Sequence, residues 1–184
     1  MAVPTSEKSK SRCLYWCGFA SERNMNTKLD RIDGSTMTDS STGTSRSTDE
    51  MIARSNQRSP GTLVGLLGIE IVEVGDNSIS GRLPLRPELL APNGYLHAGT
   101  VVTFADTMSG YGCWNQIPDG ATGFTTIELK TNFLGTARSG TLACTATLRH
   151  GGRSTQIWDA EVADEQGKVI ALFRCTQMIL YPKA

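Results

Sequence analysis

The chain has 184 residues, which is enough for one domain of ordinary size and a terminal segment. Its 18 basic and 18 acidic residues balance without forming a basic block, so the composition gives no support to a nucleic-acid or membrane-surface partner. No apolar run approaches the roughly 18 residues that a membrane-spanning helix needs.

Residues 1–50 contain nine serines and seven threonines but few aliphatic side chains. Such a segment cannot bury enough apolar surface to offset the entropy lost on ordering. We therefore expect a disordered tail over 1–50, followed by one domain over 51–184. Translation could also begin at Met25, Met37 or Met51, which would place part of the tail outside the natural protein.

The domain is expected to open near Thr48, where "STDEMIARS" has a helix-capping signal and acidic residues in a first turn. "GIEIVEVGDNSISGRLPL" over 68–85 then predicts two strands joined by a tight turn, because alternating aliphatic residues flank Gly-Asp-Asn. A proline-containing loop over 86–98 follows.

Residues 98–114 are predicted to form one long helix. Apolar side chains recur there with helical spacing, which defines a stripe that faces the core. The stripe consists of Val101, Phe104, Ala105, Met108 and Gly112.

Four strands are predicted after this helix, over 121–134, 140–150, 153–164 and 168–180. Gly151-Gly152 between the second and third reads as a hairpin turn with positive φ angles. One long helix and six antiparallel strands, the last four in a meander, indicate an α+β fold in which the sheet wraps the helix. The last strand is apolar on both faces, which suggests a second buried surface such as a subunit interface.

Asp106 interrupts the long helix, and it lies off the apolar stripe on a face of small residues. A carboxylate on such a face is partly desolvated when another element covers it, and desolvation raises its pKa and its strength as a base. The alternative is a solvated surface aspartate. At the helix start, free N–H groups and the helix dipole favour developing negative charge, as in the oxyanion of an acyl-transfer reaction.

His97 and Asp106 are nine residues apart, which is about 13 Å along a helix and on opposite faces. Asp106 therefore cannot reach a carbonyl held at its own helix start. If both groups act on one substrate, they come from two copies of the chain related by a two-fold axis.

"HAGTVVTFAD" and the following "TTIELKTNFLGTARSG" resemble the hotdog-fold acyl-CoA thioesterases of the PaaI-like and 4-hydroxybenzoyl-CoA type, over residues 60–182. The resemblance implies a hotdog fold, with Asp106 as general base or nucleophile on the thioester. It also implies that the backbone N–H of Ala98, in a position usually occupied by glycine, polarises the thioester carbonyl beside His97 and Gly99.

The same resemblance suggests that Thr126, or its neighbour Thr125, helps to place the attacking water. Asn93 is the candidate for contacting the carbonyl or the water, although its spacing from the histidine is shorter than in the family. Arg149 and Arg153 could bind coenzyme A phosphates, with solvated hairpin arginines as the alternative.

His150, the second histidine, precedes the Gly-Gly turn and is not expected in the site. The five cysteines are odd in number and scattered, so we expect reduced thiols, a cytoplasmic location, and neither a metal nor a cofactor.

The sequence thus predicts hydrolysis of an acyl- or aryl-CoA thioester by a homodimer or a homotetramer. The alternative from another class is a non-catalytic hotdog module that binds acyl-CoA, and a second enzymatic alternative is a hotdog dehydratase or hydratase. A pure binding module gains nothing from a desolvated carboxylate, which favours the hydrolase.

Overall fold

The computed structural model describes residues 48–183, so the predicted tail lies outside the described residues except at its end. Helix α1 begins at Thr48 and takes in the last three residues of the range assigned to that tail. No helix of the described residues is long and apolar enough to cross a membrane. The elements are α1 Thr48–Gln57, α2 Leu63–Leu67, β1 Glu70–Val74, β2 Ser78–Pro84, η1 Pro87–Leu89, α3 Ala98–Asn115, β3 Gly123–Phe133, β4 Thr141–Gly151, β5 Thr155–Ala163 and β6 Val169–Leu180.

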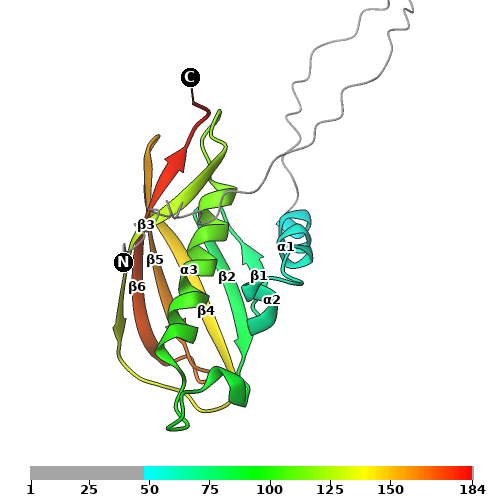
Figure 1. Cartoon of the computed structure of the whole chain (residues 1–184), viewed down its shortest axis with the longest axis vertical. Helices are drawn as coiled ribbons and strands as arrows, with labels where there is room; N and C mark the ends of the chain where they lie inside the picture. Colours follow the sequence, from blue (N-terminus) through cyan, green and yellow to red (C-terminus); the bar gives the residue numbers. More distant parts are fainter. Residues whose placement is uncertain (1–47, 184) are drawn as a thin grey trace, which may run out of the picture.

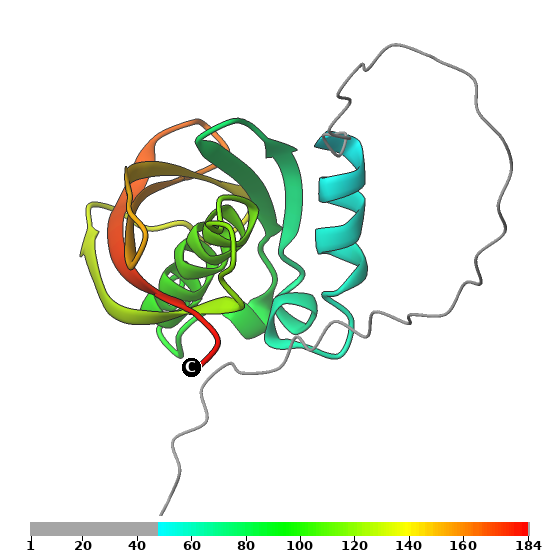
Figure 2. The ribbon, with the colours of Figure 1, turned by 90° about the horizontal axis from the view of Figure 1, so that it is seen from above.

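One antiparallel sheet in the order β1-β2-β4-β5-β6-β3 curls around α3, which is the hotdog arrangement (Figures 1 and 2). The predicted hairpin, long helix and four later strands are confirmed to within three residues at each end. The prediction of a four-strand meander is wrong for β3, which pairs with β6 instead of β4. β4 has β2 on one edge and β5 on the other, so neither edge of β4 is open to β3.

The stripe predicted on α3 packs into the concave face of the sheet, where Val101, Phe104, Ala105 and Met108 are all buried. Gly112 allows this close packing, since a Cβ there would lie 2.6 Å from the Trp158 ring. The helix is therefore fixed in rotation, and the residues off the stripe take defined positions relative to the strands.

Helix α1 lies along the outer edge of β1 (Figure 2). The Asn56 side chain donates to the Ile71 carbonyl and accepts from the Ile71 N–H, both at 2.9 Å, so it satisfies backbone groups of the edge strand. Helix α2 was not predicted, because five residues are too short to show a period. Its ends are set by the Thr62 cap and by Gly68, whose φ is 78°.

The turn between β4 and β5 differs from the prediction. Neither Gly151 nor Gly152 has a positive φ, and Gly151 is the last residue of β4. The Gly152 N–H donates to the Thr155 carbonyl at 2.9 Å, and a bulge lies between Leu148 and His150. The bulge increases the local twist of β4, and the positive φ angles expected at the two glycines are not needed.

Candidate active site

Helix α3 begins with a backbone donor that has no use within the part of the chain that the structure describes. His97 is the N-cap, and its Nδ1 accepts the Gly99 N–H at 2.9 Å. Its carbonyl accepts the N–H groups of Thr100 and Val101. The exposed Ala98 N–H has no acceptor among the described residues, so it is available to an incoming carbonyl oxygen.

The loop before α3 holds Asn93 in a turn. The Asn93 Oδ1 accepts the Tyr95 N–H at 3.2 Å, and Gly94 next to it has a φ of 80°. This hydrogen bond is a local Asx turn, which uses the amide oxygen but leaves the amide N–H groups exposed. Asn93 therefore lies in the same loop as His97 and Ala98, with a structural role of its own.

Asp106 lies in the middle of α3 and is half-buried. The Thr126 hydroxyl on β3 donates to Asp106 Oδ1 at 3.3 Å. Burial raises the pKa of Asp106 above its ordinary value, and the hydrogen bond from Thr126 partly opposes this rise. Thr125 has the opposite orientation on β3, since its cross-strand partner Met178 faces the outside of the sheet.

Three further residues near Asp106 come from positions that the sequence did not single out as site residues. Burial raises the pKa of the Cys175 thiol on β6 to about 11, and the negative charge of Asp106 adds to this rise. Gln177 Nε2 donates to this thiol at 3.5 Å, and Ser109, whose hydroxyl donates to the Ala105 carbonyl at 2.9 Å, lies beside it. Cross-strand pairing brings Gln177 beside Thr126, a relation that only the β3–β6 register reveals.

The predicted residues thus form two groups in one chain. Asp106 and Thr126 are in contact, whereas Asn93, His97, Ala98 and Gly99 gather at the start of α3. Nine helical residues separate the groups by about 13 Å along the axis and place them on opposite faces.

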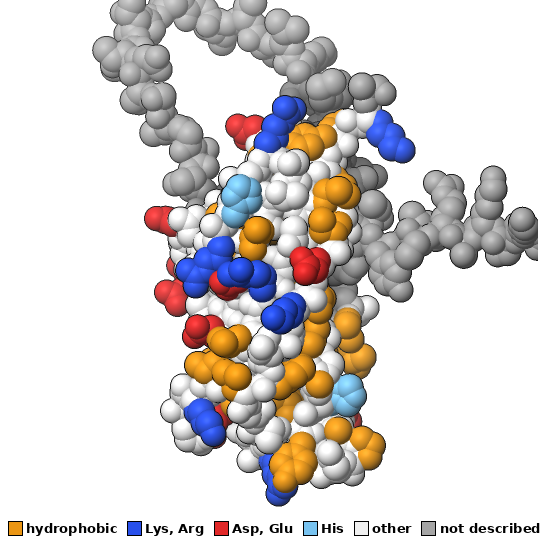
Figure 3. All heavy atoms as spheres, turned by 90° about the vertical axis from the view of Figure 1, so that its left-hand side faces the viewer, with side chains coloured by type: hydrophobic (Ala, Val, Ile, Leu, Met, Phe, Trp, Pro, Cys, Tyr) orange, Lys and Arg blue, Asp and Glu red, His pale blue; other side chains and the backbone are white. Residues whose placement is uncertain are grey.

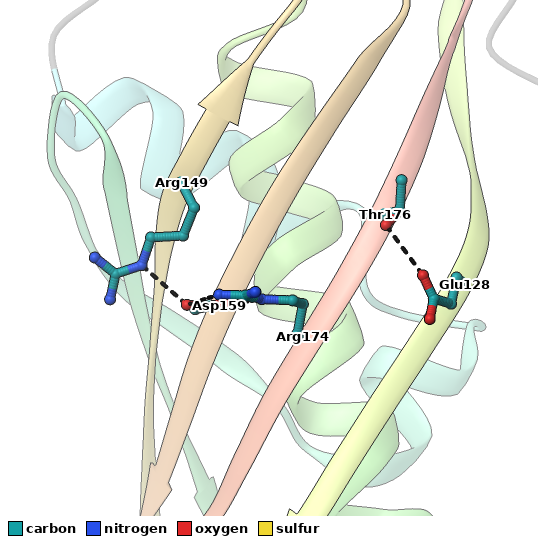
Figure 4. Close-up of polar contacts among 5 residues, drawn as sticks. All are labelled: Glu128, Arg149, Asp159, Arg174 and Thr176. Carbon is teal, nitrogen blue, oxygen red and sulfur yellow. Dashed lines mark hydrogen bonds and ion pairs between the residues drawn. The ribbon is translucent and has the colours of Figure 1, made fainter.

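Arg149 lies on the outer face of the sheet, opposite α3 (Figure 4). Its Nε is 3.0 Å from Asp159, whose other oxygen is 2.5 Å from Arg174 on β6. The hydrogen bond from Arg174 lowers the pKa of Asp159 and keeps it ionised. Arg149 therefore has a carboxylate partner in the structure and is remote from Asp106.

Arg153 lies in the bend between β4 and β5, with its guanidinium 5.4 Å from the centre of the Tyr181 ring. His150 is exposed at the end of β4. Neither residue contacts Asp106 or the start of α3.

Two surface hollows of about 500 and 370 Å³ lie away from both groups. The larger lies between α1, α2 and β1, and the smaller lies beside the β4–β5 bend, where Arg153 and Gln156 line it. Neither hollow reaches Asp106 or Ala98.

Comparison with known proteins adds independent information. A model of the thioesterase superfamily matches residues 93–171, which include both groups. The 1,4-dihydroxy-2-naphthoyl-CoA hydrolase of Listeria monocytogenes is 33% identical over 110 residues, covering 60% of this chain and 89% of that protein. The acyl-coenzyme A thioesterase PaaI of Escherichia coli is 31% identical over 109 residues, covering 59% of this chain and 75% of PaaI.

A solved thioesterase structure from Pseudomonas aeruginosa superposes with a TM-score of 0.68 at 26% identity, and the match covers 70% of this chain and 93% of that one. The fold, the matched region and these relatives agree with one another. The chain therefore belongs to the thioesterase superfamily, as a PaaI-like thioester hydrolase with the hotdog fold.

Proposed function

We propose that this protein hydrolyses an acyl- or aryl-CoA thioester to the free acid and coenzyme A, in a site built from two copies of the chain. The observation that carries the proposal is the half-buried Asp106 carboxylate, which lies on a face of α3 outside the core stripe. It accepts a hydrogen bond from the Thr126 hydroxyl on β3. Burial holds the pKa of Asp106 above its usual range, as a general base requires.

In this mechanism the thioester carbonyl oxygen binds at the start of α3, where the free Ala98 N–H and the helix dipole stabilise the oxyanion. Asp106 takes a proton from water, and the resulting hydroxide adds to the carbonyl carbon. When the tetrahedral intermediate collapses, the thiolate of coenzyme A leaves and receives the proton. Direct attack by the Asp106 carboxylate is the other form of the same reaction.

The two-copy arrangement is supported by the edge of the sheet at β3. β3 is the last strand in the sheet order, and no strand within residues 48–183 pairs with its outer edge. Large apolar side chains are exposed along it and just after it, and Figure 3 shows hydrophobic side chains gathered on this side of the molecule. These residues are Ile127, Leu129, Phe133 and Leu134. Exposed apolar surface beside an open edge favours pairing with a second copy.

A two-fold axis at this edge would make the α3 helices antiparallel neighbours. Asp106 of one copy would then approach the Ala98 N–H of the other, which the distance of about 13 Å within one chain does not allow. The homodimer is the functional unit in this proposal, alone or as half of a homotetramer.

Three features bear on the substrate and the compartment. The named activity of the Listeria relative is on an aryl-CoA, and that of PaaI is on an acyl-CoA, so both classes are candidates here. Arg153 is the better of the two arginine candidates for a coenzyme A phosphate, because Arg149 is paired with Asp159. We place the enzyme in the cytoplasm, where the buried thiols Cys113, Cys144 and Cys175 stay reduced.

The direct test is the release of free thiol from a panel of short-chain, long-chain and aromatic acyl-CoAs, with wild type and Asp106→Asn side by side. Turnover by wild type with loss in Asp106→Asn supports the hydrolase. Tight binding of an acyl-CoA by both proteins without thiol release from either would instead establish a non-catalytic binding module.

A further inference from the structure

Gln177 is a buried polar side chain that the mechanism above does not use. It is 0% exposed on the concave side of β6. Its Nε2 donates to Cys175 Sγ, but its Oε1 has no hydrogen-bond partner among the described residues. A buried carbonyl oxygen without a donor is costly, so a donor within its reach is expected.

The sheet register places Gln177 between two side chains that carry donors. Gln156 lies opposite it on β5 and donates to the Gln116 carbonyl, and Thr126 lies opposite it on β3. Thr126 stands directly opposite Gln177 in the ladder, and both side chains face α3. Directly opposed residues have Cβ atoms about 4.5–5.5 Å apart, a span that a glutamine side chain and a hydroxyl can bridge. The Thr126 hydroxyl has one proton, and in the structure it goes to Asp106 Oδ1.

We propose that Gln177 is a positioning residue of this site, whose Oε1 accepts the Thr126 hydroxyl while Asp106 holds the proton taken from water. The inference rests on the proposed role of Asp106 as general base. An ionised carboxylate only accepts hydrogen bonds, so Thr126 donates to it. A protonated Asp106 carries an O–H of its own, which donates to Thr126 Oγ1 and turns the threonine proton towards Gln177.

Gln177 thereby stabilises the protonated form of Asp106 and strengthens the base. The side chains that face Asp106 from the sheet are Thr126 on β3 and the Cys175 thiol on β6, and Cys113 on α3 interacts with Cys175. Burial raises the pKa of Cys113 to about 12, so both thiols are neutral over the working pH range. Their charge does not change when Asp106 titrates.

The test is Gln177→Met, which keeps the length of the side chain and removes the acceptor. The matched control is Gln156→Met, directly opposite Gln177 on the neighbouring strand β5, which removes the other donor beside Gln177 and leaves Thr126 in place. Gln156 is equally buried, but its Oε1 has a donor, since it accepts from Trp158, and its Nε2 donates to the Gln116 carbonyl. Loss of a buried amide should lower the melting temperature of both variants, so stability does not distinguish them.

The acidic limb of the pH–kcat/KM profile should move to lower pH in Gln177→Met and stay in place in Gln156→Met. The weaker base should also lower kcat about two- to tenfold with little change in KM, the range expected for one hydrogen bond. With Thr126→Val in place, Gln177→Met should move the limb no further, because Gln177 acts through the Thr126 hydroxyl.

A direct titration of Asp106 keeps this test separate from the test of the activity. The carboxyl band of Asp106, taken as the infrared difference between each protein and its Asp106→Asn form, reports the pKa without turnover. A lower pKa in Gln177→Met supports the inference even if no thioester is hydrolysed. If Gln177→Met does not fold, Gln177→Glu retains an acceptor and adds a carboxyl group, and it should raise the pKa of Asp106. An unchanged Asp106 pKa in the folded variant overturns the proposal.

Discussion

The carboxylate of Asp106 lowers the stability of the folded state, although the proposed chemistry requires it. A half-buried carboxylate has lost part of its hydration, and one hydrogen bond from Thr126 only partly replaces it. Because burial raises its pKa, the folded state binds the Asp106 proton more tightly than the unfolded state does. The resulting loss in the free energy of unfolding is therefore absent at pH values below the ordinary aspartate pKa and fully present above the raised pKa of the folded state.

Asp106→Asn should accordingly lower kcat by about 10²-fold or more, the contribution of a general base. The same variant should melt at a higher temperature than wild type at neutral pH, because asparagine still accepts from Thr126 without carrying a charge. This gain should shrink as the pH falls through the raised pKa of Asp106. Thiol release and melting curves from pH 4 to 8 measure both effects. Equal melting temperatures at neutral pH would contradict the assignment of desolvation as the dominant cause.

The two histidines should behave differently. His97→Ala removes the acceptor of the Gly99 N–H at the start of α3, at a cost of about 1 kcal/mol, and disturbs the loop that presents the Ala98 N–H. We expect a loss of at least tenfold in kcat/KM. His150→Ala, at the exposed end of β4, should remain within about twofold of wild type. A larger loss in His150→Ala would reverse the assignment.

Among single residues, those marked by the helical period or by the family motif could be predicted from the sequence. Asp106 off the apolar stripe, His97 at the helix start and Thr126 on the next strand follow from these patterns, and the structure brings Asp106 and Thr126 into contact. Cys175 and Gln177 could not be found this way, because they reach Asp106 only through the register of β6 against β3. The ion pair of Arg149 likewise depends on a bulge that no local pattern marks.

At the scale of elements, the long periodic segments were predictable and their placement was not. Alternation identifies β3 as a strand, but only the occupied edges of β4 explain why it does not pair with β4. The turn after Gly151 illustrates the same limit, since two adjacent glycines suggested positive φ angles where a bulge supplies the twist. Tertiary pairing decides such features.

The position of β3 at the sheet edge predicts a matched pair of variants. Leu129 on β3 is 44% exposed and Leu172 on the outer face of β6 is 43% exposed, so an aspartate perturbs the monomer similarly at either site. Leu129→Asp should give monomers and lose at least tenfold in kcat, because the site then lacks its second half. Leu172→Asp should keep the dimer and its activity, even if a tetramer separates into dimers.

Sedimentation velocity and thiol release, measured on the same samples, check this prediction. A fully active monomer of Leu129→Asp would contradict the two-copy site. Loss of the dimer in Leu172→Asp alone would move the interface to the outer face of the sheet.

At the scale of the whole molecule, the boundary of the domain can be tested by truncation. Removing residues 1–47 should leave turnover and melting temperature unchanged, because α1 begins at Thr48. Removing residues 1–57 should lower the melting temperature, since it takes away Asn56, which bonds both backbone groups of Ile71, and the Ser55 carbonyl that accepts from Tyr111. A marked loss in the shorter truncation would show that the tail belongs to the functional enzyme.

In the proposed dimer, each site combines Asp106 of one chain with the Ala98 N–H of another. Two variants isolate the halves: Asp106→Asn removes the base, and Ala98→Pro removes the donor. Proline suits the first position of α3, because the preceding His97 has the extended backbone, φ −68° and ψ 131°, that proline requires of its neighbour. Each variant alone should lose about 10²-fold in kcat.

The most direct measurement is to unfold the two variants, mix them in equal amounts, refold them and assay thiol release. Random pairing makes about half of the dimers mixed, and in each mixed dimer one site carries both defects while the other carries neither. A site shared between chains therefore predicts recovery to about a quarter of wild-type activity. If mixed dimers form, as mass spectrometry of the refolded sample would establish, and activity remains at the level of the single variants, each site lies within one chain and the proposed shared site is wrong.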